Sequence, residues 1–213
     1  MNKKILVKAY LASNLGDDMF VLQLVHRYPN VDFLIFSAGV HANVFKKCHN
    51  VRIVPPRLFD LDNLFYCFLK IRPITFMLSK IVLAVVHIGG SIFIEPKQWR
   101  EENYKLPKAT RFYLGANFGP YQTERFLKNV EKRLSLALDV CFRDTYSYDK
   151  FSHLKNVRHA PDILFGYSNY PEICEGEYLG ISVIDLCGRE GLAEMEGQYL
   201  DFLTENVEAF YQK

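Results

Sequence analysis

Short apolar segments, each followed by a turn rich in glycine or acidic residues, recur along most of this chain. Six of them have the length and composition of β-strands, at residues 5–10, 31–36, 51–54, 81–86, 111–114 and 139–142. The run at 81–86 is almost wholly apolar, which is typical of a strand buried on both faces at the centre of a parallel sheet.

Helical patterns separate these segments, at residues 17–28, 41–48, 61–80, 123–138 and 146–153, and Pro73 is expected to break the third helix. The regular alternation of strand and helix predicts right-handed βαβ units. We therefore expect an α/β fold built on a doubly wound, mostly parallel, Rossmann-like sheet.

The pattern changes after Pro161. Residues 166–176 are rich in Tyr, Ser, Asn, Pro and Glu and predict a linker, which a strand at 178–184 and a helix at 198–211 follow. One strand and one helix cannot bury a core of their own. We expect a Rossmann-like domain at 1–172 and, at 173–213, a linker and the beginning of a truncated second α/β domain.

Composition narrows the function classes. The chain has 213 residues and a net charge of +2, with acids and bases interspersed, so no basic stripe for nucleic acid is expected. The five cysteines are odd in number and widely spaced, which indicates reduced thiols in a cytoplasmic protein rather than a disulfide or metal framework. No signal peptide is visible, and neither a metal nor a cofactor is expected.

The segment 58–94 is apolar enough to suggest a membrane, but Asp60, Asp62, Lys80 and other polar residues interrupt it. It therefore lacks the ~20 uninterrupted apolar residues of a spanning helix. Burial against the sheet is the first interpretation. Peripheral contact with the inner face of a membrane, through aromatic residues near Phe68 and neighbouring basic residues, is the alternative.

Two of the strand-end turns offer groups that could contact a ligand. The first contains Asn14, Gly16, Asp17 and Asp18; one aspartate is expected to cap the following helix, which leaves the other to face a cleft. The second contains Gly89, Gly90 and Ser91, whose backbone N–H groups could hold an anion or a sugar hydroxyl. A tight turn without a ligand is the alternative for these glycines.

Two further turns follow later strands. Asn117 and Gly119 form one, and Pro120 is expected to begin the next helix. Arg143 ends a strand and could grip a carboxylate or phosphate, or instead form a structural pair with Asp144 or Asp162. Because the carboxyl ends of parallel strands lie at one edge of a sheet, these turns predict a shared cleft for a small anionic or sugar-like ligand.

The ordered set of motifs resembles the polysaccharide pyruvyl transferase family. The motifs are Asn14-x-Gly-Asp-Asp18, Gly89-Gly-Ser-Ile-Phe93, Gly115-x-x-x-Gly-Pro120, Arg143-Asp-x-x-Ser-Tyr148 and Ala160-Pro-Asp-Ile163. The match covers about residues 4–186, which correspond to the family's N-terminal half. It implies a glycosyltransferase-B-like pair of Rossmann-like domains and transfer of pyruvyl from phosphoenolpyruvate to a sugar hydroxyl as a ketal, in cell-surface polysaccharide synthesis.

The resemblance also implies roles and partners. Asp18 and Arg143 would be catalytic, and the substrate-binding set would be Asn14, Gly16, Asp17, Gly89, Gly90, Ser91, Asn117 and Gly119. The partners would be phosphoenolpyruvate and a glycan or lipid-linked sugar acceptor. Two alternatives stay open: a sugar-nucleotide glycosyltransferase of similar fold, and a non-catalytic remnant that binds a glycan or a partner chain.

Overall fold

The computed structural model describes residues 3–11, 14–37, 43–69, 71–97, 99, 110–167, 180–181, 183, 186 and 191–212. The chain divides into two compact units, Met1–Ser168 and Asn169–Lys213. In the second unit, the 3-10 helix η2 (Ala193–Met195) leads into the helix α6 (Glu196–Tyr211). Most of the linker expected at 166–176 lies outside the described residues. Of the strand expected at 178–184, residues 180, 181 and 183 are described, and none of the three is in a strand.

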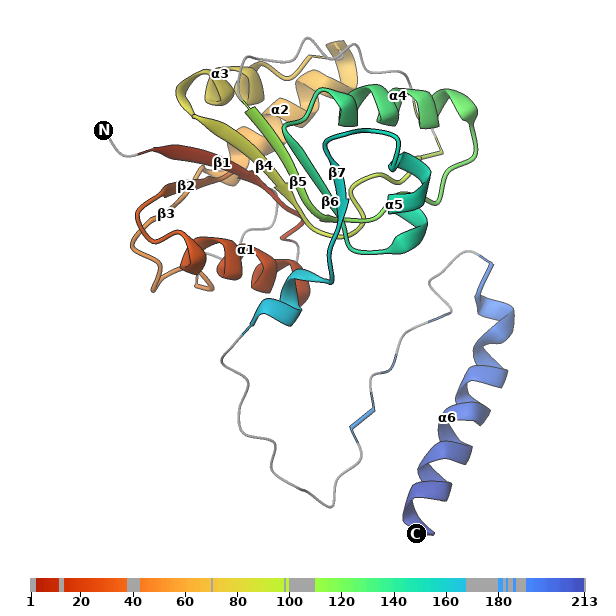
Figure 1. Ribbon diagram of the computed structural model, residues 1–213. Coiled ribbons are helices and arrows are strands. Elements are labelled where there is room, and N and C mark those ends of the chain that lie inside the picture. Colours follow the sequence, from red (N-terminus) through yellow and green to blue (C-terminus); the bar gives the residue numbers. More distant parts are fainter. Residues whose placement is uncertain are drawn as a thin grey trace. The chain divides into compact units, whose positions relative to one another are not determined.

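The first unit is built on an open sheet of seven parallel strands in the order β3-β2-β1-β4-β5-β6-β7 (Figure 1). The strands are β1 (Lys4–Lys8), β2 (Asp32–Ile35), β3 (Val51–Ile53), β4 (Ala84–Ile88), β5 (Thr110–Ala116), β6 (Asp139–Phe142) and β7 (Val157–His159). This arrangement confirms the predicted α/β fold with a Rossmann-like sheet, and it places the apolar strand β4 at the centre.

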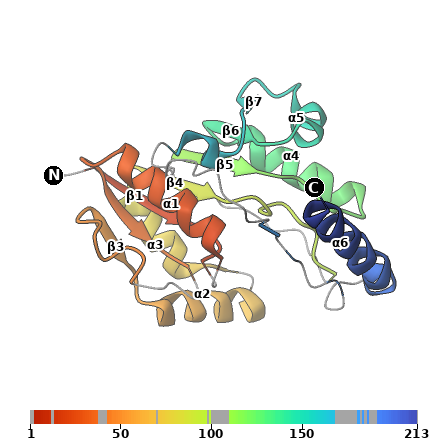
Figure 2. The ribbon, with the colours of Figure 1, turned by 90° about the horizontal axis from the view of Figure 1, so that it is seen from below.

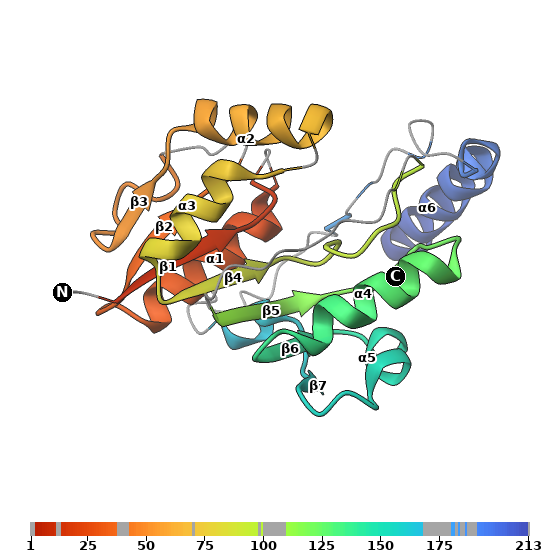
Figure 3. The ribbon, with the colours of Figure 1, turned by 90° about the horizontal axis from the view of Figure 1, so that it is seen from above.

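Helices lie on both faces of the sheet. The helix α1 (Leu15–Arg27) runs along one face, next to the 3-10 helix η1 (Ile163–Gly166), as Figure 2 shows from below. The other face carries α2 (Pro56–Leu69) and α3 (Pro73–Ile81) at one end, and α4 (Glu124–Ser135) at the other (Figure 3). The short helix α5 (Thr145–Phe151) packs on β6 and β7.

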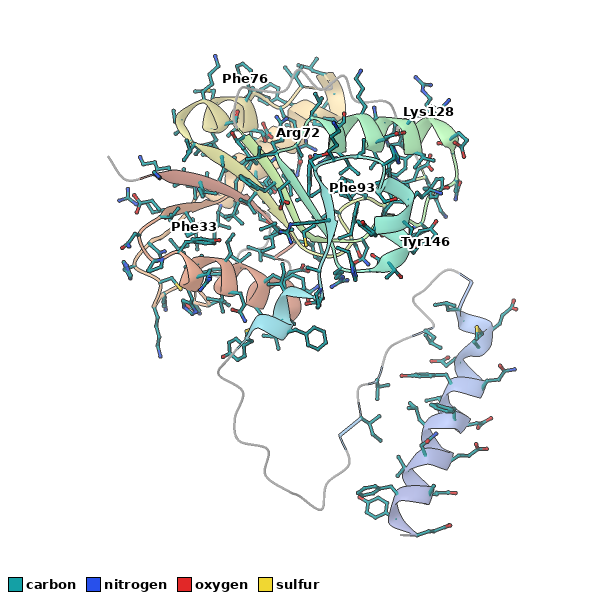
Figure 4. All side chains as sticks on the ribbon, viewed as in Figure 1. Phe33, Arg72, Phe76, Phe93, Lys128 and Tyr146 are labelled. Carbon is teal, nitrogen blue, oxygen red and sulfur yellow. The ribbon has the colours of Figure 1, made fainter. Side chains whose placement is uncertain are left out.

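Alternate residues of the central strands bury themselves on opposite faces. Val7 and Val86 pack with Phe20 and Val25 of α1, and Phe33, labelled in Figure 4, belongs to the same cluster. On the opposite face, Leu6, Phe36 and Val85 form a cluster with partly buried residues of α2 and α3, and Tyr113 and Phe142 form another with α4 and α5. Packing on both faces of the sheet therefore fixes the positions of the strand ends.

Several boundaries differ from the sequence-based expectations. The central strand begins at Ala84, because α3 continues to Ile81 and one apolar run covers both elements. Residues 43–47, expected to be helical, form turns. Pro120 does not begin α4: it follows a cis peptide bond, and α4 starts at Glu124, where the Thr123 hydroxyl accepts a hydrogen bond from the Phe126 amide. The short strand β7 was not expected.

Candidate functional site

The turns after β1 and β4 lie side by side at the centre of the sheet, where the chain leaves β1 toward β2 and β4 toward β5. Open α/β sheets bind ligands at such a reversal of strand order. Asn14 closes the first turn: its Oδ1 accepts hydrogen bonds from the amides of Gly16 at 3.0 Å and Asp17 at 3.5 Å. Asn14 therefore caps α1, in place of the aspartates that were expected to do so.

Asp17 and Gly89 meet across these two turns. A Cβ atom on Gly89, whose φ is 139°, would lie 2.9 Å from Asp17 Oδ1, so glycine permits the close approach. Burial raises the pKa of the Asp17 carboxyl above its usual value; Arg143 opposes this shift and Asp18 adds to it. The fold thus brings a carboxyl that retains its proton more readily than usual next to the Gly89 turn.

Arg143 connects several elements beside the Gly90 turn. Its Nε donates to Asn117 Oδ1 at 2.6 Å, and its Nη1 donates to Asp162 Oδ2 at 2.7 Å. A Cβ atom on Gly90 would clash with Nη2 of the same guanidinium. The structural interpretation of Arg143 offered Asp144 or Asp162 as its partner, and Asp162 is the one that pairs with it. The pair fixes a positive charge close to the Gly90 backbone.

Asp144 and Ser147 extend this network at the start of α5. Asp144 accepts hydrogen bonds from Asn117 Nδ2 at 2.6 Å and from the Ser147 amide at 2.8 Å. The Ser147 hydroxyl, which is buried, accepts the amide hydrogen of Phe118 at 2.8 Å. Both polar atoms of the Asn117 side chain thus bond to other side chains of the protein, to Arg143 and Asp144. These bonds, with that of Phe118, position the turn that carries Gly119.

One cavity of about 1560 Å³ begins at these turns. Among the predicted site residues, those that line it are Asn14, Gly16, Asp17, Gly89, Gly90, Ser91 and Arg143. Asp18, Asn117 and Gly119 do not line it; Asp18 is buried. Of the two adjacent aspartates, Asp17 is therefore the one that reaches the cavity.

The cavity continues across the sheet, where residues of α2, α3 and α4 line it. Figure 3 shows the arrangement of these helices from above. Basic side chains line this part: Lys8 of β1, His87 of β4, Arg111 of β5, Arg133 of α4, and Arg72, which is labelled in Figure 4. Sequence reasoning did not identify them as a group. Lys8 and Arg111 do stand out in the sequence as charges inside predicted strands, and that is the pattern that could have found them.

The electrostatics of this second part differ from those of the first. Burial, assisted by Arg72 and other neighbouring cations, lowers the pKa of Lys8 from 10.5 to about 7. Burial also lowers the pKa of His87 well below its usual value, with Arg133 and Lys8 adding to the shift. This region favours an incoming anion, because the cations already lie close together.

Neither a metal-binding group nor a membrane-spanning helix is found among the described residues. No group of three or more His, Cys, Asp and Glu side chains in these parts of the chain could hold a metal ion. No described helix is long and apolar enough to span a bilayer.

Comparison with known proteins identifies a family for this chain. Searches of curated proteins and of solved structures each returned no match. The family model described as polysaccharide pyruvyl transferase matches residues 14–209, which include the strand-end turns and nearly the whole chain. This chain therefore belongs to the polysaccharide pyruvyl transferase family.

Proposed function

We propose that this protein acts in the cytoplasm in the transfer of pyruvyl from phosphoenolpyruvate to a sugar as a ketal, during synthesis of a cell-surface polysaccharide. Membership of the family supports the reaction class. The observation that carries the proposal is the placement of Asp17 at a cavity whose charged lining is otherwise mostly cationic. Phosphoenolpyruvate carries both a carboxylate and a phosphate, so it suits such a lining.

The chemistry requires one proton donor and stabilisation of negative charge. Protonation of the methylene carbon of phosphoenolpyruvate generates a cationic centre at the adjacent carbon, which one sugar hydroxyl attacks. Departure of phosphate regenerates that centre, and a second hydroxyl closes the ketal. The two hydroxyl protons balance the one gained by the methyl group and the one carried away by hydrogen phosphate.

Asp17 is our candidate for the proton donor, because its pKa is raised and its carboxyl faces the cavity. The Gly89 and Gly90 backbones would hold the sugar or the donor, together with Asn14, Gly16 and Ser91. Arg143 would supply positive charge near the donor. Asp18, Asn117 and Gly119 would act from behind this surface, by positioning α1 and the Arg143 guanidinium.

We also propose peripheral contact between the α2–α3 surface and the membrane that carries a lipid-linked acceptor. Phe68 is 78% exposed and Met77 is 68% exposed, and Phe76, labelled in Figure 4, lies on the same helix as Met77. The exposed cations Arg57 and Lys80 belong to these helices, and they suit an anionic bilayer. Replacing Phe68 and Met77 by Glu should reduce sedimentation with phosphatidylglycerol vesicles. Leu136→Glu, at an exposed position directly after α4, should not.

Transfer is tested by incubating the full chain with phosphoenolpyruvate and a panel of aryl or lipid-linked sugars, while phosphate release is followed. We expect sugar-dependent release that Asp17→Asn reduces at least about a hundredfold, the size typical of general-acid loss. The matched control is Asp149→Asn, which changes an exposed aspartate on α5. Release that Asp17→Asn leaves unchanged would contradict the role of Asp17.

A thermal-shift measurement separates the main alternative. Stabilisation by phosphoenolpyruvate supports the proposed donor, and the same ligand should lose its effect when Arg143 and Asp17 are both replaced. Stabilisation by a nucleotide sugar, with no response to phosphoenolpyruvate, would instead favour a glycosyltransferase of the same architecture.

A further inference from the structure

The cations in the cavity share one face of the sheet because of the strand register. Lys8 of β1 pairs with His87 of β4, and His87 pairs with Tyr113 of β5. Arg111 lies two residues before Tyr113, so its side chain projects from the same face. Arg133 reaches this face from α4, where its Nε donates to the Tyr113 hydroxyl at 2.8 Å. We refer to Lys8, Arg111 and Arg133 as the cationic cluster. His87 lies among them, but its lowered pKa keeps the ring neutral near pH 7.

Acidic residues in the described parts of the chain do not balance this cluster. Asp62 of α2 does act on Lys8 through its charge, but its oxygens accept hydrogen bonds from the Ile74 and Thr75 amides and from the Thr75 hydroxyl. The Asp62 Oδ2 atom also lies 3.7 Å from Arg72 Nη1, so the two side chains form an ion pair. The described lining of the cavity contains five lysine and arginine side chains and one carboxyl, Asp17, which lies at the other end beside the Gly89 turn.

Gathering these cations opposes folding. Burial and neighbouring cations lower the pKa values of Lys8 and His87, and burial, with Arg133 contributing, also lowers the pKa of Arg111. A core would be more stable with apolar residues at such positions, because partly buried charges of one sign repel and lose hydration. Strained electrostatics beside a cavity are typical of a site whose ligand relieves them.

We infer that the cationic cluster binds the phosphate group of a ligand, as a second anion site separate from the strand-end turns. Arg111 and Arg133 offer planar guanidinium groups that match phosphate oxygens, and Lys8 offers a compact charge. Tyr113 orients Arg133, and the Lys8 ammonium donates to the Thr75 hydroxyl at 3.3 Å. The phosphate could belong to phosphoenolpyruvate or to a phosphate-linked sugar acceptor. Only the phosphoenolpyruvate source depends on the proposed function.

Binding at this site should be coupled to protonation of Lys8. The groups around its ammonium are Arg72 and Asp62 from the α2–α3 side, Arg111 and His87 from the sheet, and Arg133 from α4. A bound phosphate would add negative charge next to Lys8 and favour its charged form. The complex should therefore take up a proton near neutral pH, and affinity should fall as the pH rises through about 7.

The test is titration calorimetry of the full chain with three ligands: inorganic phosphate, phosphoenolpyruvate and a nucleotide sugar. We expect inorganic phosphate to bind, with proton uptake revealed by a heat that depends on the ionisation enthalpy of the buffer. Lys8→Met and Arg133→Gln should each weaken binding about tenfold or more, as expected for loss of a charge-assisted contact. The control is Lys132→Gln, which removes an exposed charge next to Arg133 in sequence.

The ligand series identifies the source of the phosphate. Tighter binding of phosphoenolpyruvate than of inorganic phosphate, lost in Lys8→Met, assigns the site to the donor. Tighter binding of the nucleotide sugar assigns it to a sugar phosphate. Absence of millimolar binding of all three ligands, or binding that Lys8→Met leaves unchanged, overturns the inference.

A thermal melt controls for folding. Lys8→Met should leave the unfolding temperature of the ligand-free chain unchanged or higher, because it removes a charge from a crowded cluster. If Lys8 instead stabilised the fold, its removal would lower the unfolding temperature. A lower unfolding temperature together with unchanged phosphate binding therefore also counts against the site. Because binding is measured directly, the inference can fail while pyruvyl transfer is observed, and the reverse also holds.

Discussion

The two ends of the cavity use positive charge in opposite ways. At the strand ends, Arg143 donates to Asn117 and Asp162, and Asn117 in turn donates to Asp144. Over the face of the sheet, Arg133 donates to the Tyr113 hydroxyl and Lys8 to the Thr75 hydroxyl, and burial and like charges lower the pKa of Lys8. In the first arrangement a carboxylate of the protein pairs with the guanidinium, whereas in the second the described lining is mostly cationic.

This difference separates a charge that also holds the protein's own turns together from charges that mainly repel one another in the absence of a ligand. A guanidinium that is paired with carboxylate and amide oxygens fixes the geometry of the turns around it, and its removal leaves those oxygens without their partner. A group of like charges contributes repulsion until an anion arrives. We therefore expect substitutions at the two ends to change the free energy of unfolding in opposite directions.

The largest effect should follow Arg143→Ala. Loss of the guanidinium leaves the partly buried Asp162 and Asn117 oxygens unpaired, so we expect the free energy of unfolding to fall by about 3 kcal/mol. Urea denaturation of the full chain measures this change.

Arg158→Ala is the matched control for Arg143→Ala. Arg158 also pairs with an aspartate, Asp139, but its side chain is 52% exposed, so the expected loss is below about 1 kcal/mol. Equal losses for the two variants would remove the contrast between the buried network and an exposed pair.

Lys8→Met should act in the opposite direction. The pKa of Lys8 is about 7 in the folded chain and near its usual 10.5 in the unfolded chain, so the unfolded state binds more protons between these values. Lys8 therefore costs the folded state no stability above about pH 10.5, and it destabilises the fold increasingly as the pH falls toward 7. We expect Lys8→Met to be more stable than the parent by about 2 kcal/mol near pH 6.

The pH dependence provides the check. The stability difference between Lys8→Met and the parent should shrink as the pH rises from about 7 to about 9, in urea titrations at matched ionic strength. A difference that stays constant across this range would mean that Lys8 keeps its proton in the fold, and the electrostatic contrast between the two ends would disappear.

Gly89→Ala should have a smaller effect at the strand-end region. The residue adopts a φ of 139° and its new methyl group would lie 2.9 Å from Asp17 Oδ1, so backbone strain and a contact combine. We expect a loss of about 1.5 kcal/mol in the free energy of unfolding, with a larger loss of transfer activity because the Asp17 carboxyl must move. The control is Gly166→Ala, where no atom beyond the neighbouring residues of the chain lies within 4 Å of the new methyl group.

The contrast also shows what the sequence could predict. The apolar run of β4 and the turns at Asn14 and Gly89 identified the central strand and the edge where the cavity begins, because both depend on local patterns. Helix α3 and β4 share one apolar run, so their boundary was misplaced by three residues, from 81 to 84. Local patterns alone do not show where such a run changes from helix to strand.

The cationic cluster required information that no local pattern contains. Lys8 and Arg111 are far apart in the chain, and only the pairing register of β1, β4 and β5 brings them, with His87 between them, to one face. The choice between Asp17 and Asp18 is of the same kind. Adjacent residues on α1 point in different directions, and the orientation of the helix on the sheet decides which one reaches the cavity.

The smallest expected effect concerns His87. Its pKa lies well below the usual value in the folded chain, so below about pH 6.5 the unfolded state binds a proton that the folded state does not. The free energy of unfolding of the parent chain should therefore fall as the pH drops from 7.5 to 6, by less than about 1 kcal/mol for this residue. In His87→Phe this part of the fall should be absent. Phe retains a ring that can pack on Tyr113, whose ring centroid lies 5.0 Å from that of His87. Since burial is the largest cause of the shift and Lys8 a lesser one, the effect should persist, slightly reduced, in the Lys8→Met background. If it vanishes there, charge repulsion rather than burial keeps His87 neutral, and the two residues titrate as one unit.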